Sequence, residues 1–170
     1  MLRDFQKEDL QAVSELWLSA NLDDHDFIRA SWWKKQQAAV RQQLMQAEVI
    51  VATEGDQICG FIGLQGEWVA GLFVRRQNRC AGIGKALLDE AKRRHPTLSL
   101  SVYRRNEKAV AFYRREGFVT VRQSVEKDSG MKELTMRWPQ NEKEGGRSDG
   151  SACDRDGIQS AVAAALPAGG

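Results

Sequence analysis

The chain has 170 residues, of which 42% are hydrophobic and 28% are charged, a mixture typical of one soluble folded domain and unlike that of a disordered or collagen-like chain. Its formal net charge of +2 is too small to attract nucleic acid, so we expect no nucleic-acid partner. The longest apolar runs fall far short of the roughly 20 residues that cross a bilayer, and the N-terminus has no apolar signal core, so we expect a cytoplasmic protein without membrane contact.

The first 45 residues predict one short strand and two helices. A strand is expected at residues 2–5, and Asp9 can cap a helix whose apolar residues recur every three or four positions. The polar segment 21–26 is expected to end this helix. A second helical segment then runs from about Phe27 to Met45.

The spacing of the apolar residues changes from a helical to a strand pattern at residue 48. Runs rich in β-forming residues cover 48–53, 57–65 and 68–74, and short glycine-containing turns separate them. This pattern is typical of three antiparallel strands that follow one another in a meander.

Helices and strands alternate in the next part of the chain. A helix is expected at 82–94 with Pro96 behind it, a strand at 98–103, and a helix at 107–115 with Gly117 as its C-terminal cap. Residues 118–125 and 133–138 form a hairpin. The whole order predicts an α/β (α+β) fold with a mixed, mostly antiparallel central sheet of six to seven strands, flanked by helices.

The composition changes again near residue 140, where polar residues and then alanines replace the periodic pattern and no aromatic residue occurs. We therefore expect one domain over residues 1–139 and a disordered or loosely docked tail over residues 140–170.

The most informative segment joins the strand that ends at Val74 to the following helix. It is basic and holds two glycines at the helix start. Backbone amides at a helix N-terminus bind anions, and glycine allows a close approach, so the segment favours a bound phosphate group. A dinucleotide fingerprint would need Gly or Ala where Leu87 stands, and a P-loop would need Ser or Thr where Ala86 stands. Both of these commoner phosphate sites are thereby excluded.

Two segments together resemble the signatures of the GNAT acetyltransferases. Residues 79–84 match Arg/Gln-x-x-Gly-x-Gly/Ala, and residues 106–118 match Asn-x-x-Ala-x-x-Phe-Tyr followed by three residues and Gly-Phe. The resemblance covers most of residues 1–138 and is to the small stand-alone bacterial type. It implies a GNAT-like fold and transfer of an acetyl group from acetyl-CoA, used as a cosubstrate without a metal, to a primary amine.

The resemblance also implies which residues hold acetyl-CoA. The glycine-containing loop binds the pyrophosphate, the backbone of the preceding strand binds the pantetheine, and Asn106 supports the pantetheine arm, although an Asn there is also an ordinary N-cap. The implied binding residues are Leu72, Phe73, Val74, Arg79, Cys80, Ala81, Gly82, Ile83, Gly84, Lys85, Asn106 and Tyr113.

Tyr113 is the predicted catalytic acid. A phenol with an ordinary pKa of about 10 stays protonated at neutral pH and can donate to a departing thiolate, whose ordinary pKa is about 8.5. The alternative is a core aromatic residue beside Phe112. Cys80 has no histidine near it in sequence, so direct attack of the amine in a ternary complex is favoured over a covalent route.

The base that accepts the proton of the amine is left open. Many relatives carry a glutamate where this chain has Trp68, and the adjacent Glu67 should point to the other face unless a bulge or turn redirects it. Glu67 and His25 are the candidates, and a water chain or a desolvated amine remains an alternative. Trp68, His25 and Phe27 are the predicted acceptor-binding residues, with core packing as the alternative for Trp68.

The expected acceptor is a protein lysine or N-terminus, and the segment 25–28 resembles that of small bacterial members that modify protein lysines. Two alternatives stay open: transfer to a small amine such as a metabolite or antibiotic, and a CoA-binding regulatory module with little catalysis. We expect a monomer or a weak homodimer. The cysteines and histidines are too few and too widely spaced to predict disulfides or a metal site.

Overall fold

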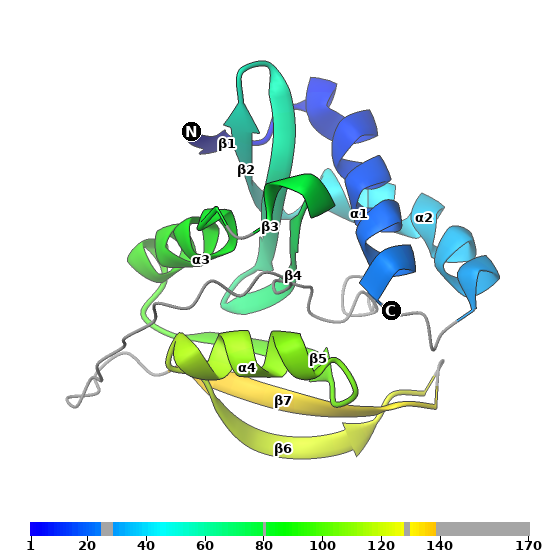
Figure 1. The fold of residues 1–170 in the computed structure, drawn as a ribbon, viewed down its shortest axis with the longest axis vertical. Helices are drawn as coiled ribbons and strands as arrows, with labels where there is room; N and C mark the ends of the chain where they lie inside the picture. Colours follow the sequence, from blue (N-terminus) through cyan, green and yellow to red (C-terminus); the bar gives the residue numbers. More distant parts are fainter. Residues whose placement is uncertain (25–28, 80, 128–129, 139–170) are drawn as a thin grey trace.

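A computed structural model describes residues 1–24, 29–79, 81–127 and 130–138. Seven strands form one sheet in the order β1-β2-β3-β4-β5-β7-β6, as Figure 1 shows. The strands are β1 (Leu2–Asp4), β2 (Glu48–Glu54), β3 (Gln57–Gln65), β4 (Trp68–Val74), β5 (Leu98–Tyr103), β6 (Val119–Val125) and β7 (Lys132–Trp138). The helices are α1 (Leu10–Asp24), α2 (Ala30–Leu44), α3 (Ile83–Arg94) and α4 (Glu107–Arg115), with short 3-10 turns η1 (Lys7–Asp9) and η2 (Arg76–Asn78).

The sheet is antiparallel except at one place. Strands β1 to β4 pair in sequence order, and β7 lies between β5 and β6. Among the strands of the described residues, only β4 and β5 are parallel, and they share a single register pair, Trp68 with Ser99. The predicted mixed, mostly antiparallel sheet of six to seven strands is confirmed.

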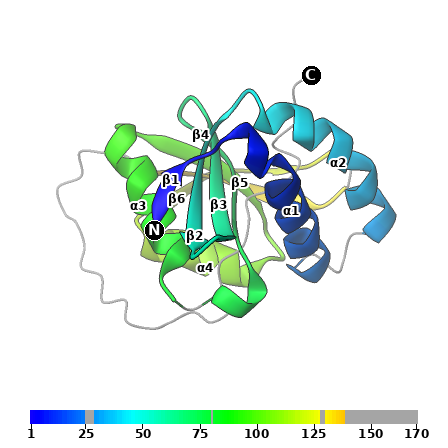
Figure 2. The same ribbon diagram turned by 90° about the horizontal axis from the view of Figure 1, so that it is seen from above.

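Helices cover both faces of the sheet, with α3 on one side of β2–β4 and α1 and α2 on the other (Figure 2). Each face has its own buried cluster of apolar side chains. The first cluster includes residues of α3 and α4, and the second includes residues of α1 and α2. We call these two sides the α3/α4 face and the α1/α2 face. Because successive side chains of a strand alternate between the faces, every strand residue can be assigned to one of them.

Helix α1 extends to Asp24, so it ends inside the polar segment 21–26 that was predicted to end it. Asn21 is fully buried, and its Nδ2 donates a hydrogen bond to the carbonyl oxygen of Trp17, 2.8 Å away. The side chain therefore bonds within the helix instead of ending it, while neighbouring Ala20 packs in the core. The second helix begins at Ala30 in the described residues, and its predicted start at Phe27 lies outside them.

Asp9 does not act as the predicted cap of α1. It belongs to η1, and its carboxylate accepts the backbone N–H of Gln6 at 2.7 Å and pairs with Arg3 at 2.9 Å. Asp9 thus holds the turn between β1 and α1. None of the helices in the described ranges is both long and apolar enough to cross a membrane.

Candidate active site

The site is organised by the divergence of β4 and β5. On its β3 side, β4 is paired at both of its ends, with Leu72 opposite Ile62 and Phe73 opposite Phe61. On its β5 side, pairing stops after Trp68 and Ser99. Because backbone amides of a strand point alternately to its two edges, β4 presents hydrogen-bonding groups of residues 69–74 toward this divergence. An extended ligand that carries amide groups can bind along such an edge.

A β-bulge lies in β4 beside the divergence. The register between β3 and β4 shifts after the pair Gly63 and Gly71, which gives β4 one extra residue. The shift lies on the C-terminal side of Trp68, so it leaves the direction of Glu67 unchanged. Trp68 is half-buried and packs against the apolar cluster of the α1/α2 face. A β-bulge changes the direction of the backbone N–H groups around it. At this position, such N–H groups can point into the divergence, where they could donate hydrogen bonds to the carbonyl oxygen of a ligand.

Glu67 lies in the turn before β4, at the end of the divergence where β4 and β5 are still paired. Its carboxylate is exposed and accepts a hydrogen bond from the Thr97 hydroxyl at 2.7 Å, while its carbonyl oxygen accepts the N–H of Ser99 at 2.9 Å. The other predicted base, His25, lies outside the described residues, as does Phe27. Both assignments stay predictions.

The loop between β4 and α3 has the geometry expected of an anion site. Gly82 adopts φ +80°, which favours glycine, and a Cβ added there would meet no atom within 4 Å. The first amides of α3 follow directly, and their N–H groups have no partner within the helix. Open space in front of a helix N-terminus fits a bound pyrophosphate.

Basic side chains of the loop and of the first turn of α3 form hydrogen bonds and ion pairs with other residues of the protein. Arg79 donates from Nε to the carbonyl oxygen of Val74 at 3.3 Å, and Lys85 lies 3.3 Å from Asp89 and 3.4 Å from Glu116. Lys85 remains exposed, and Cys80 lies outside the described residues. Arg79 therefore ties the loop to the end of β4, and Lys85 links the first turn of α3 to Glu116 at the end of α4.

Asn106 and Tyr113 join α4 to this site. Asn106 is buried at the start of α4, where its Oδ1 accepts the N–H of Ala109 at 3.3 Å, so it is the N-cap of this helix. Tyr113 is fully buried on the α3/α4 face, with ring centroids 5.2 Å from Phe112 and 5.6 Å from Phe118. Its hydroxyl has no hydrogen-bond partner among the described residues, and burial raises the pKa of Tyr113.

Aromatic side chains gather on the α1/α2 face. Trp17 and Trp33 pack edge to face with centroids 5.9 Å apart, and Trp32 contacts Trp33 at 4.7 Å. Tyr103 and Trp68 belong to the same cluster. We call this set of five residues the aromatic cluster. Trp17, Trp32 and Trp33 come from α1 and α2, whereas Trp68 is the first residue of β4.

One polar residue near this cluster was missed by the sequence analysis. Glu133 is the register partner of Tyr103 across β5 and β7. In the sequence, Leu134 and Met136 alternate with polar residues, which indicates a strand with one apolar and one polar face. This pattern does not show which helices cover the face that carries Glu133. Within the described ranges, no three His, Cys, Asp or Glu side chains are grouped as a metal site.

Comparisons with known proteins agree with this geometry. The acetyltransferase (GNAT) domain family matches residues 3–139. The peptidyl-lysine N-acetyltransferase YiaC of Escherichia coli K12 is 35% identical over 141 residues, which are 82% of this chain and 97% of YiaC. The solution structure of apo-form YjaB from Escherichia coli has a TM-score of 0.73 at 28% identity and covers 81% of this chain and 96% of YjaB. The structure of yncA from Salmonella typhimurium with its cofactor acetyl-CoA has a TM-score of 0.58 at 18% identity, covers 88% of this chain and 98% of yncA, and shares the fold.

Proposed function

The chain belongs to the GNAT acetyltransferase family, and we propose that it transfers the acetyl group of acetyl-CoA to the side-chain amine of a protein lysine. The observation that carries this proposal is the similarity to YiaC over nearly the whole of that relative, which is a peptidyl-lysine N-acetyltransferase. It favours the protein lysine over the two alternatives, a small amine and a regulatory module. The end of the family match at residue 139 supports a domain over residues 1–139.

The geometry supports acetyl-CoA as the cosubstrate. The open space at Gly82 and the first amides of α3 suit the pyrophosphate, and the free edge of β4 at Leu72, Phe73 and Val74 suits the amides of the pantetheine. A carbonyl oxygen near the bulge would face backbone N–H groups, which stabilise the negative charge that develops there. Arg79, Ala81, Ile83, Gly84 and Lys85 complete the loop, together with Cys80.

We propose direct attack of the lysine amine in a ternary complex. The nitrogen forms a bond to the thioester carbon, and the bond from that carbon to sulfur breaks. Tyr113 donates its proton to the leaving thiolate, because burial keeps the phenol protonated. Asn106 supports the reaction indirectly by fixing the start of α4 and hence the position of Tyr113.

Activation of the amine is the costly step. A lysine with an ordinary pKa of about 10.4 is mostly protonated at pH 7, and removal of its proton costs about 4.6 kcal/mol. A base near the acceptor can offset this cost, and Glu67 and His25 are the sequence-based candidates. We further propose that the enzyme acts in the cytoplasm, as a monomer or a weak homodimer.

The test is an acetylation assay with acetyl-CoA and three acceptor classes: lysine peptides with a blocked N-terminus, peptides with a free N-terminus and no lysine, and small amines. Release of free CoA thiol gives the rate, and mass spectrometry locates the acetyl group. We expect the highest kcat/KM with lysine peptides. A clear preference for small amines, or acetyl-CoA binding without transfer to any class, would refute the lysine assignment.

The cosubstrate site is tested in parallel with Gly82→Gln. Its side chain would occupy the space assigned to the pyrophosphate, so calorimetry should show at least about a tenfold loss of acetyl-CoA affinity, or about 1.4 kcal/mol. Gly66→Gln is the matched control, because Gly66 also has positive φ (+63°) and open space, but lies at the paired end of β4. Equal effects of the two substitutions would show that backbone strain, not ligand contact, is responsible.

A further inference from the structure

A carboxylate on β7 stands next to the proposed acceptor side without a bonding partner. Glu133 is half-buried, and among the described residues no hydrogen bond or ion pair joins its carboxylate to another group. By contrast, Glu48, Glu90 and Glu116 all form ion pairs. Burial removes part of the hydration of this carboxylate, so a bound cation would stabilise it.

The strand alternation places Glu133 on the α1/α2 face. Leu134 and Met136 belong to the apolar cluster of the α3/α4 face, whereas Met131 packs against the cluster of the α1/α2 face. Residues 131, 133 and 135 of the β7 segment therefore share the second face. Tyr103, the register partner of Glu133, belongs to that same cluster.

This position is one strand away from the divergence of β4 and β5. Side chains of directly opposed residues lie about 4.5 to 5.5 Å apart at Cβ, so Glu133 adjoins Tyr103, and the other edge of β5 borders the divergence. Trp68 and Phe73 of β4 face the same side from across the divergence. An aliphatic side chain that enters past these aromatic groups would bring its terminal nitrogen into the region that Glu133 adjoins.

The surroundings of Glu133 suit a proton acceptor. Burial and the negative charge of Glu126 raise the pKa of Glu133, while the positive charge of Arg122 on β6 opposes this shift. From β5, the phenol of Tyr103 is the titratable group on the same face. A raised carboxyl pKa brings the base closer to neutral pH, where proton transfer from an amine is more effective.

We propose that Glu133 binds the ammonium group of the acceptor lysine and takes its proton. This inference rests on the proposed function. The carboxylate accepts one proton from the ammonium group, and the neutral nitrogen attacks the thioester carbon. As the carbon–sulfur bond breaks, the thiolate takes the proton of Tyr113, which regains one from the acetylated nitrogen. Glu133 then releases its proton to water, so one proton is liberated per turnover.

The central test is Glu133→Gln, which keeps the size of the side chain and removes the base. We expect kcat/KM for the lysine peptide to fall about 100-fold or more at neutral pH, with acetyl-CoA affinity unchanged. The melting temperature at pH 7 should stay or rise, because the ionised carboxylate disfavours the folded state when its pKa is raised. A purely structural role predicts the reverse, namely a lower melting temperature and a nearly unchanged rate.

Two neighbouring substitutions test the same carboxylate without removing it. Glu126→Gln should lower the pKa of Glu133 and move the acidic limb of the kcat/KM profile to lower pH, whereas Arg122→Gln should move it to higher pH. Glu67→Gln, measured under the same conditions, tests whether Glu67, the base predicted from the sequence, contributes to kcat/KM instead of Glu133. Activity of Glu133→Gln within twofold of wild type, or identical acidic limbs in all neighbouring variants, would overturn the proposal.

The design separates this inference from the proposed function. If the wild type acetylates only small amines, the assignment of a lysine acceptor is refuted. The decrease of kcat/KM in Glu133→Gln is then measured with the small amine that the wild type acetylates best. If the wild type transfers to no amine, the carboxyl ¹³C resonance of Glu133 is followed while a lysine peptide is added to the enzyme with CoA. Movement of that resonance supports the binding role of Glu133, and its constancy overturns it.

Discussion

At the scale of single residues, Tyr113 and Glu133 share an unusual property. Each places a polar group in a partly or fully buried position without a hydrogen-bond partner among the described residues. An unsatisfied buried hydroxyl costs about 1 to 3 kcal/mol, so the hydroxyl of Tyr113 does not stabilise the fold. They lie on opposite faces of the sheet, Tyr113 on the α3/α4 face and Glu133 on the α1/α2 face. This arrangement suits a reaction in which cosubstrate and acceptor approach the divergence from two sides.

The prediction at this scale concerns Tyr113→Phe. The substitution preserves the ring and its packing on Phe112 and Phe118, and it removes only the proton donor. We expect kcat to fall at least about 100-fold if the chemical step limits turnover. The free energy of unfolding should stay within about 1 kcal/mol of wild type or rise, because no partner of the hydroxyl is left unsatisfied.

Steady-state kinetics, thermal melting and acetyl-CoA binding on the same variant check this prediction. Tyr103→Phe is the comparison, because it removes the hydroxyl of the other tyrosine, which is equally buried but lies on the other face. It should not reduce kcat by a comparable factor. Full activity of Tyr113→Phe would remove this residue from the catalytic assignment.

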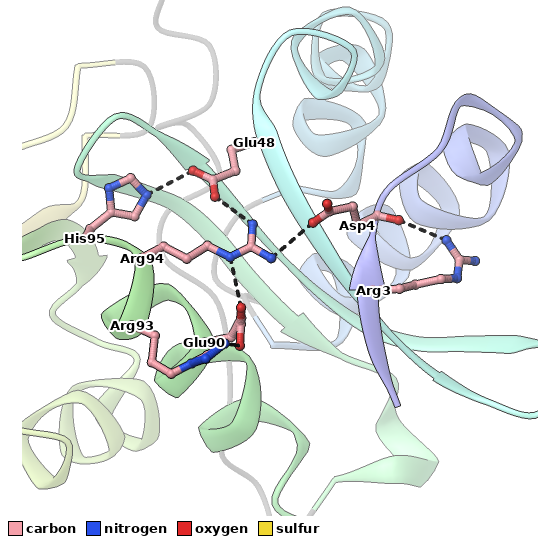
Figure 3. A network of polar contacts seen from close by, with 7 residues as sticks. All are labelled: Arg3, Asp4, Glu48, Glu90, Arg93, Arg94 and His95. Carbon is pink, nitrogen blue, oxygen red and sulfur yellow. Dashed lines mark hydrogen bonds and ion pairs between the residues drawn. The ribbon is translucent and has the colours of Figure 1, made fainter.

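At the scale of elements, the two ends of α3 have different surroundings. Its N-terminus faces the open space at Gly82, whereas its C-terminus is anchored to the sheet by Arg94, as Figure 3 shows. The guanidinium group contacts Glu48 of β2 at 2.9 Å, Glu90 of α3 at 3.0 Å and Asp4 of β1 at 3.1 Å. His95 adds a contact of 2.9 Å to Glu48. The network fixes the helix whose other end is proposed to bind the pyrophosphate.

The prediction at this scale is that Arg94→Met lowers the stability by about 1 kcal/mol, a drop of a few degrees in melting temperature, because several partly exposed pairs are lost together. Arg93→Met is the matched control. Arg93 is the adjacent residue and, in the part of the chain that the structure describes, pairs only within α3, with Glu90 at 2.6 Å, so its loss should have a smaller effect. Equal effects of both substitutions would contradict an anchoring role for Arg94.

The same network predicts a pH dependence. Burial opposes the ionisation of Glu48, but hydrogen bonds from Arg94 and His95 outweigh it and lower the pKa of this carboxyl. A lowered carboxyl pKa contributes stability above the ordinary value of about 4.3, and this contribution is lost as the pH falls below it. The stability difference between wild type and Arg94→Met should therefore shrink below about pH 4 in thermal melts.

At the scale of the whole molecule, one sheet with two independently packed faces separates the two proposed substrates. Residues 140–170 lie outside the described part of the chain, and the family match ends at residue 139. Their composition lacks the periodic apolar residues of a packed element.

We therefore predict that a chain ending at Gln140 keeps the melting temperature and the acetyl-CoA affinity of the full chain. Thermal melting and calorimetry on the two forms check this. A decrease of several degrees would show that the alanine-rich end docks on the domain.

Much of this protein follows from its sequence alone, because the relevant signals are local. The bounds predicted for 57–65, 68–74, 98–103 and 107–115 match the structure, since strand and helix periods, turns and caps are decided by neighbouring residues. The two signature segments were also sufficient to identify the family, which the comparisons show. The first segment carries the loop that is proposed to bind the pyrophosphate, and the second carries Tyr113.

Only the tertiary structure decided what depends on distant partners. Strand β7 lies between β5 and β6, and β4 and β5 share a single register pair. Such strand pairings depend on contacts across the whole sheet, so the local sequence does not determine them. The exact end of α1 within the polar segment 21–26 depends on the burial of Asn21, which the local sequence does not show. Glu133 is the clearest case, because strand alternation assigns it to one of two faces, and only the tertiary structure shows that α1 and α2 cover that face, the proposed acceptor side.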